Sequence, residues 1–148
     1  MKRSLPIVVL AVVGLGFPAS LAADDPEDIL VIVNKGTNVK SLSISEVRNI
    51  FLGDQVEWRT GKKTVPVHSK DMFLRDAFAR LVLNQKGIVD EKKYWQKQKI
   101  MHGNIEPPAF SNNLKAVFKL RGSISYVYRS QYLEGVVQVV LVVPNKSD

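Results

Sequence analysis

The sequence contains no cysteine and only two histidines among its 148 residues. Without cysteine the chain can form no disulfide, offers no thiol nucleophile and cannot build a thiolate metal site. The histidines, His68 and His102, have no partner acid at a recognisable spacing, whereas a metal site needs three or four converging ligands. We therefore expect both histidines to be structural or surface residues, and we expect no metal.

Motifs that carry catalysis are also missing. The chain has no Gly-x-Ser-x-Gly elbow, no P-loop, no His-Glu-x-x-His and no paired-carboxylate motif. It shows no internal repeat and no low-complexity tract, and its composition, 45% hydrophobic and 24% charged, is typical of a packed globular chain. We predict one domain that is not an enzyme and needs no cofactor.

Long apolar runs are absent except at the N-terminus. Lys2 and Arg3 precede ten apolar residues, Ile7 to Gly16, and small residues follow up to Ala22. This pattern is typical of a cleavable export signal. An uncleaved anchor is the alternative, but the apolar run falls short of the ~18–20 residues that a spanning helix needs.

Cleavage after Ala22 would divide the chain into a signal peptide, residues 1–22, and a mature domain, residues 23–148. The mature protein is then expected in the periplasm, with no membrane span after cleavage. Loss of Lys2 and Arg3 lowers the formal charge from +7 to about +5. A basic excess can favour anions, anionic lipid or nucleic acid, or be a solvated surface. Location argues against nucleic acid, and the lack of a strongly amphipathic basic helix argues against membrane-surface binding.

The first half of the mature chain predicts a strand, a helix and a second strand. Residues 29–33 form a continuous β-branched run, typical of a strand buried on both faces. Ser43 and Glu46 form a capping box, and Gly53 ends the helix that follows. Residues 64–68 read as a strand in which Pro66 cannot donate to a neighbour, so one side is expected to stay open.

The second half predicts three helices and two strands. The first helix is capped by Ser69 or Asp71, the second by Asp90, and the third opens at Ser111. The inward residues that we expect on them are Leu74, Ala77, Phe78, Leu81 and Val82; Tyr94, Trp95 and Met101; and Leu114, Val117 and Phe118. Residues 123–128 read as an alternating strand and residues 136–143 as a central or fully covered strand. Strands alternating with helices indicate an α/β layer structure with a mixed sheet.

The order of these elements, with several local motifs, resembles the periplasmic phosphate-binding proteins of ABC importers. Residues 42–53, LSISEVRNIFLG, are similar to the family's L-S-x-x-x-L-x-x-I-F-x-G helix, and Trp58 follows as in that pattern. Residues 121–127, RGSISYV, are similar to the family's closing P-G-A-I-G-Y-V. The resemblance implies a type 2 periplasmic-binding-protein fold, with helices on both faces of a mixed sheet.

Full-length members of that family have two lobes and hold the anion in the cleft between them. This chain has residues for a single lobe, corresponding to the second. The family's phosphate loop, roughly R-x-D-G-S-G-T before a helix, is replaced here by residues 68–75, HSKDMFLR. The glycines are gone, Met72 and Phe73 stand where small hydroxylated residues are expected, and Asp71 would repel an anion. Phosphate binding therefore does not carry over residue by residue.

A weak anion site remains one hypothesis for this stretch. Ser69, Lys70 and Arg75 could converge with the helix amides on one small oxyanion, phosphate or another. In the alternative interpretation Ser69 or Asp71 only caps the helix, while Lys70 and Arg75 are solvated. The lysine-rich run 91–99 is read as a solvated face, and Tyr128, Arg129 and Tyr132 as rim residues that could meet a partner.

Two functions follow from these observations. The first is a non-enzymatic, periplasmic solute-binding-like protein with weak affinity for phosphate or another small anion. The second is a binding-protein lobe that serves as an interaction module, contacting an envelope protein partner or forming a homodimer. The sequence does not decide between them, and it names neither the ligand nor the oligomeric state.

Overall fold

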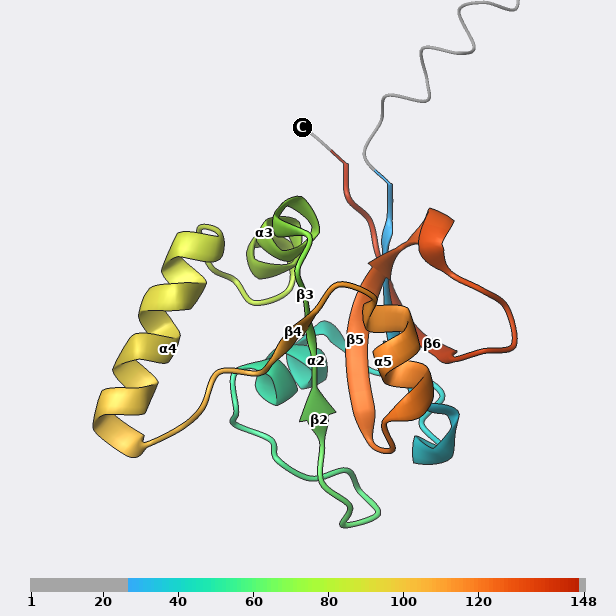
Figure 1. Ribbon diagram of the computed structural model, residues 1–148, viewed down its shortest axis with the longest axis horizontal. Coiled ribbons are helices and arrows are strands. Elements are labelled where there is room, and N and C mark those ends of the chain that lie inside the picture. Colours follow the sequence, from blue (N-terminus) through green and yellow to red (C-terminus); the bar gives the residue numbers. More distant parts are fainter. Residues whose placement is uncertain (1–26, 147–148) are drawn as a thin grey trace, which may run out of the picture.

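A four-stranded mixed sheet forms the centre of the protein, whose computed structural model describes residues 27–146 (Figure 1). The strands lie in the order β2-β5-β1-β6, with β1 antiparallel to both of its neighbours and β2 parallel to β5. Their bounds are β1 Ile29–Val33, β2 Val65–Pro66, β5 Ser123–Tyr128 and β6 Gln138–Val143. The predicted signal peptide, residues 1–22, lies outside the described residues.

All five residues of strand β1 are buried, as its composition predicts, and the strand has a neighbour on each side in the sheet. Ile29, Val31 and Val33 pack into the larger apolar cluster on one face of the sheet. Leu30 and Ile32 pack into a smaller cluster on the other face. A strand between two apolar layers needs no polar alternation, which explains the continuous β-branched run.

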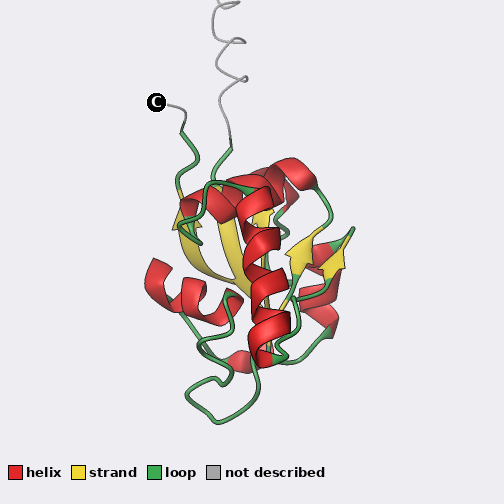
Figure 2. Ribbon diagram, turned by 90° about the vertical axis from the view of Figure 1, so that its left-hand side faces the viewer, coloured by secondary structure: helices red, strands yellow, loops and turns green. Residues whose placement is uncertain are grey.

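Helices cover both faces of the sheet, as the fold prediction requires (Figure 2). Helices α2 (Ile44–Phe51) and α3 (Met72–Leu81) contribute to the larger cluster, and α5 (Asn113–Lys119) contributes to the smaller one. Helix α4 (Ile88–His102) packs against α3 and stands at the side of the molecule in Figure 1. Two short 3-10 helices complete the structure, η3 (Lys35–Thr37) and η4 (Arg129–Gln131).

The predicted strand at residues 64–68 is split in the structure. After β2 the chain passes through Val67 into β3 (His68–Ser69), which pairs in parallel with β4 (Ala109–Phe110) as a second, two-stranded sheet. Strand β2 lies at the edge of the main sheet, as Pro66 predicts. This arrangement places the turn before α3 next to β4, because the Lys70 amide donates to the Phe110 carbonyl at 3.0 Å.

Capping residues fix the helix ends, mostly where the sequence predicts. Ser43 and Glu46 form the expected capping box at α2, and the Asp71 side chain caps α3. Helix α4 begins after Gly87, so the prediction that Asp90 caps it is wrong; Asp90 lies in the first turn instead. Gly103 ends α4 in the left-handed conformation, which is the usual conformation of glycine after a helix.

Four predictions about burial and boundaries are wrong. Strand β6 is neither central nor fully covered, because it lies at an edge of the main sheet and Val142 is 45% exposed. Strand β5 does not alternate, because it lies between β2 and β1 and is buried along nearly its whole length. Met101 and Phe118 are exposed instead of inward, and α5 is capped by Asn112 rather than opened by Ser111.

Candidate functional site

The predicted anion site lies at the N-terminus of α3, where β3 ends. The Asp71 side chain occupies this helix end: its Oδ1 accepts from the amides of Phe73 at 3.0 Å and Leu74 at 3.2 Å. These amides are the donors that an external anion would use at a helix N-terminus. The chain's own carboxylate therefore stands in the place of a bound anion.

Ser69 faces the interior of this turn. It is buried, its hydroxyl accepts from the Asp71 amide at 3.0 Å, and its own amide donates to the Tyr126 hydroxyl at 3.3 Å. Lys70 is exposed and is the one predicted site cation whose charge is free to meet solvent at this turn. Ser69 and Lys70 are thus adjacent but point to different environments.

Arg75 does not join them, because its side chain turns into the contact between α3 and α4. Its Nε lies 3.1 Å from Glu91 Oε1 and its Nη2 lies 2.6 Å from Glu91 Oε2. The same Nη2 lies 2.5 Å from Glu106 Oε1. The residue is only 3% exposed, so the alternative in which Arg75 is solvated is wrong.

Two carboxylates hold this guanidinium in its charged form. Burial alone would lower the pKa of Arg75, but hydrogen bonding and attraction to Glu91, with the hydrogen bond to Glu106, raise it. Lys92 balances the second carboxylate, with its Nζ 2.9 Å from Glu106 Oε1. The positive charge of Arg75 is therefore neutralised by carboxylates of the protein and is not available to an external anion.

His68 extends this buried cluster toward the sheet. Its Nδ1 lies 2.8 Å from the Tyr126 hydroxyl, and its Nε2 lies 3.3 Å from Glu91 Oε1 without the alignment of a hydrogen bond. Desolvation, together with the nearby charges of Arg75 and Lys92, lowers the pKa of His68 well below its usual value. The histidine is therefore neutral, and its Nδ1 shares a hydrogen bond with the Tyr126 hydroxyl.

Tyr126 stays protonated as well, since burial raises the pKa of its phenol. Its ring stacks on Phe78 with centroids 3.8 Å apart. Of this cluster, His68, Arg75, Glu91 and Tyr126 are buried, whereas Glu106 lies at its outer end with about a third of its side chain exposed. We interpret the cluster as structural, because its ion pairs and hydrogen bonds hold α3, α4 and β5 in contact. This fits the expectation that His68 is structural.

Sequence reasoning missed both glutamates of this cluster. The lysine-rich run 91–99 was expected to be a solvated face, yet Glu91 is fully buried. The spacing of Glu91 and Trp95 could have indicated its burial. The two residues are four positions apart, so Glu91 shares one face of α4 with the buried Trp95. Glu106 lies in an irregular connection, where no periodicity marks inward positions.

Exposed apolar side chains surround the α3 N-terminus. Phe73 is 84% exposed and Met72 is 55% exposed, directly after the capping Asp71. Phe110 is also exposed, and its backbone pairs with Ser69 across the two short strands. We call Lys70, Met72, Phe73 and Phe110 the tip surface. Large exposed apolar groups gathered at one place are typical of contact surfaces.

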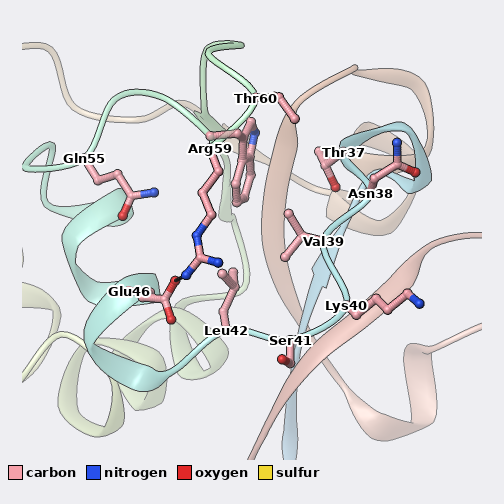
Figure 3. A pocket seen from close by; sticks show the side chains of 11 residues that line it. Thr37, Asn38, Val39, Lys40, Ser41, Leu42, Glu46, Gln55, Arg59 and Thr60 are labelled. Carbon is pink, nitrogen blue, oxygen red and sulfur yellow. Dashed lines mark ion pairs between the residues drawn. The ribbon is translucent and has the colours of Figure 1, made fainter.

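A separate groove of about 340 Å³ lies between the loop after η3 and the loop after α2. Figure 3 shows Arg59 extending from one wall toward Glu46 on α2, and their charged atoms are 4.0 Å apart. Lys40 lies on the opposite wall. The groove is polar at its rim and has Leu42 and Trp58 at its base, both of which are buried in the core.

Metal ligation and membrane insertion find no support in the described residues. Across residues 27–146, no group of three or more histidine and acidic side chains is placed to hold a metal ion. None of the helices in the same part of the chain is long and apolar enough to cross a bilayer.

Comparison of the fold with solved structures finds phosphate-transport proteins. A candidate phosphate ABC transporter substrate-binding protein from Clostridium perfringens, solved with bound phosphate, matches with a TM-score of 0.57 and 23% identity, over 85% of this chain and 51% of that one. An ABC-type phosphate transport receptor from Vibrio cholerae matches with a TM-score of 0.57 and 12% identity, over 77% and 45%. A possible phosphate binding protein from Planctomyces limnophilus DSM 3776 matches with a TM-score of 0.53 and 14% identity, over 85% and 48%.

The fold is therefore that of a single lobe of a type 2 periplasmic binding protein, as the resemblance of its motifs implies. The chain spans about half the length of the solved proteins that it matches. No protein-family model and no curated protein matches the sequence. At these identities the likeness defines the fold, and the role of the chain has to be argued from its own site.

Proposed function

We propose that this chain is a non-enzymatic periplasmic binding module that docks a protein partner through its tip surface. One observation carries the proposal: Asp71 already holds the α3 amides that an anion needs, while Phe73 beside it is 84% exposed. The names of its structural neighbours, all transport or binding proteins, support a role without catalysis. The predicted export signal supports the periplasmic location.

The chemistry of the tip surface favours a protein partner over a free anion. Arg75 is neutralised by Glu91 and Glu106, so Lys70 alone offers a positive charge. A ligand held there would also stay largely in water, whereas ligand pockets usually bury most of the ligand surface. Met72 and Phe73 instead offer apolar area that a protein surface can cover. The family resemblance implies that this turn faces a second lobe, and we propose that an envelope protein covers it here.

Site-specific crosslinking tests the proposal. A photoreactive residue in place of Met72, which is also exposed, is expected to capture one envelope protein in cells, and adding Phe73→Asp to that protein is expected to lose the crosslink. Phe118→Asp is the matched control, because Phe118 is also an exposed phenylalanine but lies on α5 at the other face of the sheet. A crosslink to a second copy of this chain would show that the tip surface forms a homodimer and does not bind a different protein. A strict monomer by sedimentation, with no crosslinked product, would overturn it.

A second candidate function is weak binding of a small oxyanion at Ser69, Lys70 and Arg75. The exposed Lys70 and the phosphate bound in the neighbour from Clostridium perfringens favour it. Isothermal titration with phosphate tests it, with Lys70→Glu expected to lose the heat. Arg75 is unsuitable for this test, because its buried ion pairs make any substitution a structural one. Flat titrations across a panel of oxyanions would remove this candidate.

Asp71→Ser sharpens the comparison of the two candidates. Serine still accepts a hydrogen bond from a helix amide but carries no charge, so the substitution removes the repulsion of an external anion at little cost in stability. If the Asp71 carboxylate excludes phosphate, millimolar phosphate should raise the melting temperature of Asp71→Ser and leave the wild type unchanged. Equal responses of the two proteins would show that Asp71 does not block the site.

A further inference from the structure

A groove of about 470 Å³ opens at the end of the molecule opposite α3, beside the loop that leads into β2 (Figure 1). Three cationic side chains line it, Lys62, Lys63 and Arg121, and none of its lining residues carries a carboxylate. We call it the basic groove. It adjoins the smaller groove of Figure 3, with which it shares Thr37, Trp58 and Thr60.

Trp58 connects the segment that carries Lys62 and Lys63 to the segment that carries Arg121, through two hydrogen bonds. Its amide donates to the Lys62 carbonyl at 2.7 Å, and its indole Nε1 donates to the Gly122 carbonyl at 2.9 Å. The indole is nearly fully buried, so both bonds are shielded from water. The lysine pair and Arg121 are therefore attached to one anchored side chain rather than to independent loops.

Gly122 allows the close approach of these segments. It has a φ of +78°, and a Cβ at this position would stand 2.6 Å from the Lys63 carbonyl oxygen. Only glycine fits both the backbone conformation and the contact. Gly122 thus holds the neighbouring Arg121 near the backbone of Lys63, where both line the basic groove.

The charges of this groove are not neutralised by the protein itself. Within residues 27–146, no carboxylate lies in ion-pair distance of Lys62, Lys63 or Arg121, whereas Arg75, Arg80 and Lys92 on α3 and α4 each have a carboxylate partner. Glu57 is bridged to Lys63 through the backbone, but it does not line the groove. Three unpaired cations on a rigid support attract anions and retain them.

We propose that the basic groove binds clustered phosphate groups carried on a larger molecule. Arginine pairs with phosphate oxygens in a bidentate manner and lysine adds point charges, so the three cations suit more than one phosphate group. The groove is also larger than a single oxyanion requires and falls in the size range of small-molecule sites. A soluble organic polyphosphate and a phosphorylated lipid headgroup share this chemistry. The inference does not depend on the tip surface, which lies at the other end of the molecule (Figure 1).

Binding is tested with two probes, one for each source. Isothermal titration with pyrophosphate measures soluble ligand, and cosedimentation with phosphatidylcholine vesicles that contain phosphatidic acid measures lipid headgroups. The groove variant is Lys62→Gln/Lys63→Gln/Arg121→Gln, in which all three replaced side chains are exposed, so the fold is retained. We expect this variant to bind at least about tenfold more weakly than the wild type.

The matched control is Lys93→Gln/Lys97→Gln/Lys99→Gln, which removes the same charge from exposed positions on α4. It should bind within about twofold of the wild type. Binding of pyrophosphate assigns a soluble ligand, and binding of the acidic vesicles alone assigns a lipid headgroup. The proposal is overturned if the wild type binds neither probe, if the groove variant keeps its affinity, or if the α4 control loses as much as the groove variant.

Discussion

At the residue scale the main feature is a largely buried charge cluster between α3, α4 and β5. Arg75 is held by two carboxylates, and His68 and Tyr126 complete the polar chain into the core. Such a cluster contributes little net stability when intact, because desolvation opposes the attraction between its charges. Its members are costly to remove singly, since each leaves an uncompensated partner in the interior.

Replacing Arg75 by methionine tests whether removing one member of the cluster costs much more than the intact cluster contributes. Arg75→Met keeps much of the side-chain volume but leaves Glu91 buried without its partner, so the free energy of unfolding should fall by about 3–5 kcal/mol. Urea denaturation measures the change. Arg80→Met is the control on the same helix, because Arg80 forms an exposed pair with Asp76 and should cost only about 0.5 kcal/mol. Adding Glu91→Gln to Arg75→Met should recover part of the loss; similar costs at positions 75 and 80 would contradict the structural role.

His68 makes the stability depend on pH. Because burial lowers the pKa of His68 below its usual 6.5, the unfolded chain takes up a proton below that pH while the folded chain does not. The free energy of unfolding should therefore fall as the pH drops from 7 to 5, by up to about 1.4 kcal/mol per pH unit from this group. His68→Asn should flatten this slope, whereas His102→Asn, at an exposed position, should not. Equal slopes for the two variants would show that His68 titrates normally in the folded state.

At the element scale, two turns position everything that we propose to be functional. The turn between β3 and α3 carries the tip surface, and the turn into β5 carries Arg121. The second turn depends on Gly122, whose φ of +78° and contact with Lys63 both require glycine. Gly103, at the end of α4, has a similar φ of +71° but open space around it. Comparing the two glycines therefore separates the cost of the left-handed backbone conformation, which both share, from the cost of the contact with Lys63, which only Gly122 makes.

Alanine at these two positions should therefore differ in cost. Gly103→Ala should lower the free energy of unfolding by about 1 kcal/mol through the left-handed conformation alone. Gly122→Ala should cost clearly more, because its methyl group also meets the Lys63 carbonyl. Thermal and urea unfolding of both variants measure the difference. Equal losses would mean that the Lys63 loop moves aside freely and that the basic groove is not rigid.

The sequence predicts most elements but not their lateral neighbours. The capping box of α2, the Asp71 cap and the buried run of β1 follow from local patterns that the structure confirms. The position of β6 at an edge does not, because pairing partners are chosen over long distances in the chain. The sequence likewise does not predict that the Arg75 side chain points inward. This orientation depends on Glu91 and Glu106, which lie 16 and 31 residues further along the chain. The predicted grouping of Ser69, Lys70 and Arg75 itself stays a prediction, with Arg75 placed apart from the other two.

At the scale of the whole molecule, the two apolar clusters share the strands β1 and β5 and so form one folding unit. Helix α4 is the most peripheral element, but it is fixed by the Arg75–Glu91 pair and by the Tyr94 hydroxyl, which donates to the Leu52 carbonyl at 2.6 Å. Elements tied to one core in this way unfold together in small domains.

We therefore expect a single unfolding transition. Trp58 reports on the loop before β2 and Trp95 on α4, so fluorescence follows two distant parts of the chain. Their signals should coincide with the loss of helical circular dichroism in urea. Trp58→Phe isolates the Trp95 signal and provides the control. A fluorescence transition of Trp95 that precedes the dichroism change would show that α4 opens separately.

Both ends of the described chain leave the sheet on the same side, because Ile29 at the start of β1 pairs with Val143 at the end of β6 and with Tyr128 at the end of β5. That side also carries the turn before α3 (Figure 1). A purification tag or immobilising linker on either terminus would therefore crowd Phe73 and its neighbours. The same linker would leave Lys62, Lys63 and Arg121 pointing into free solution. Surface-immobilised protein should thus suit measurements on phosphorylated probes, while capture of a protein partner calls for untagged material.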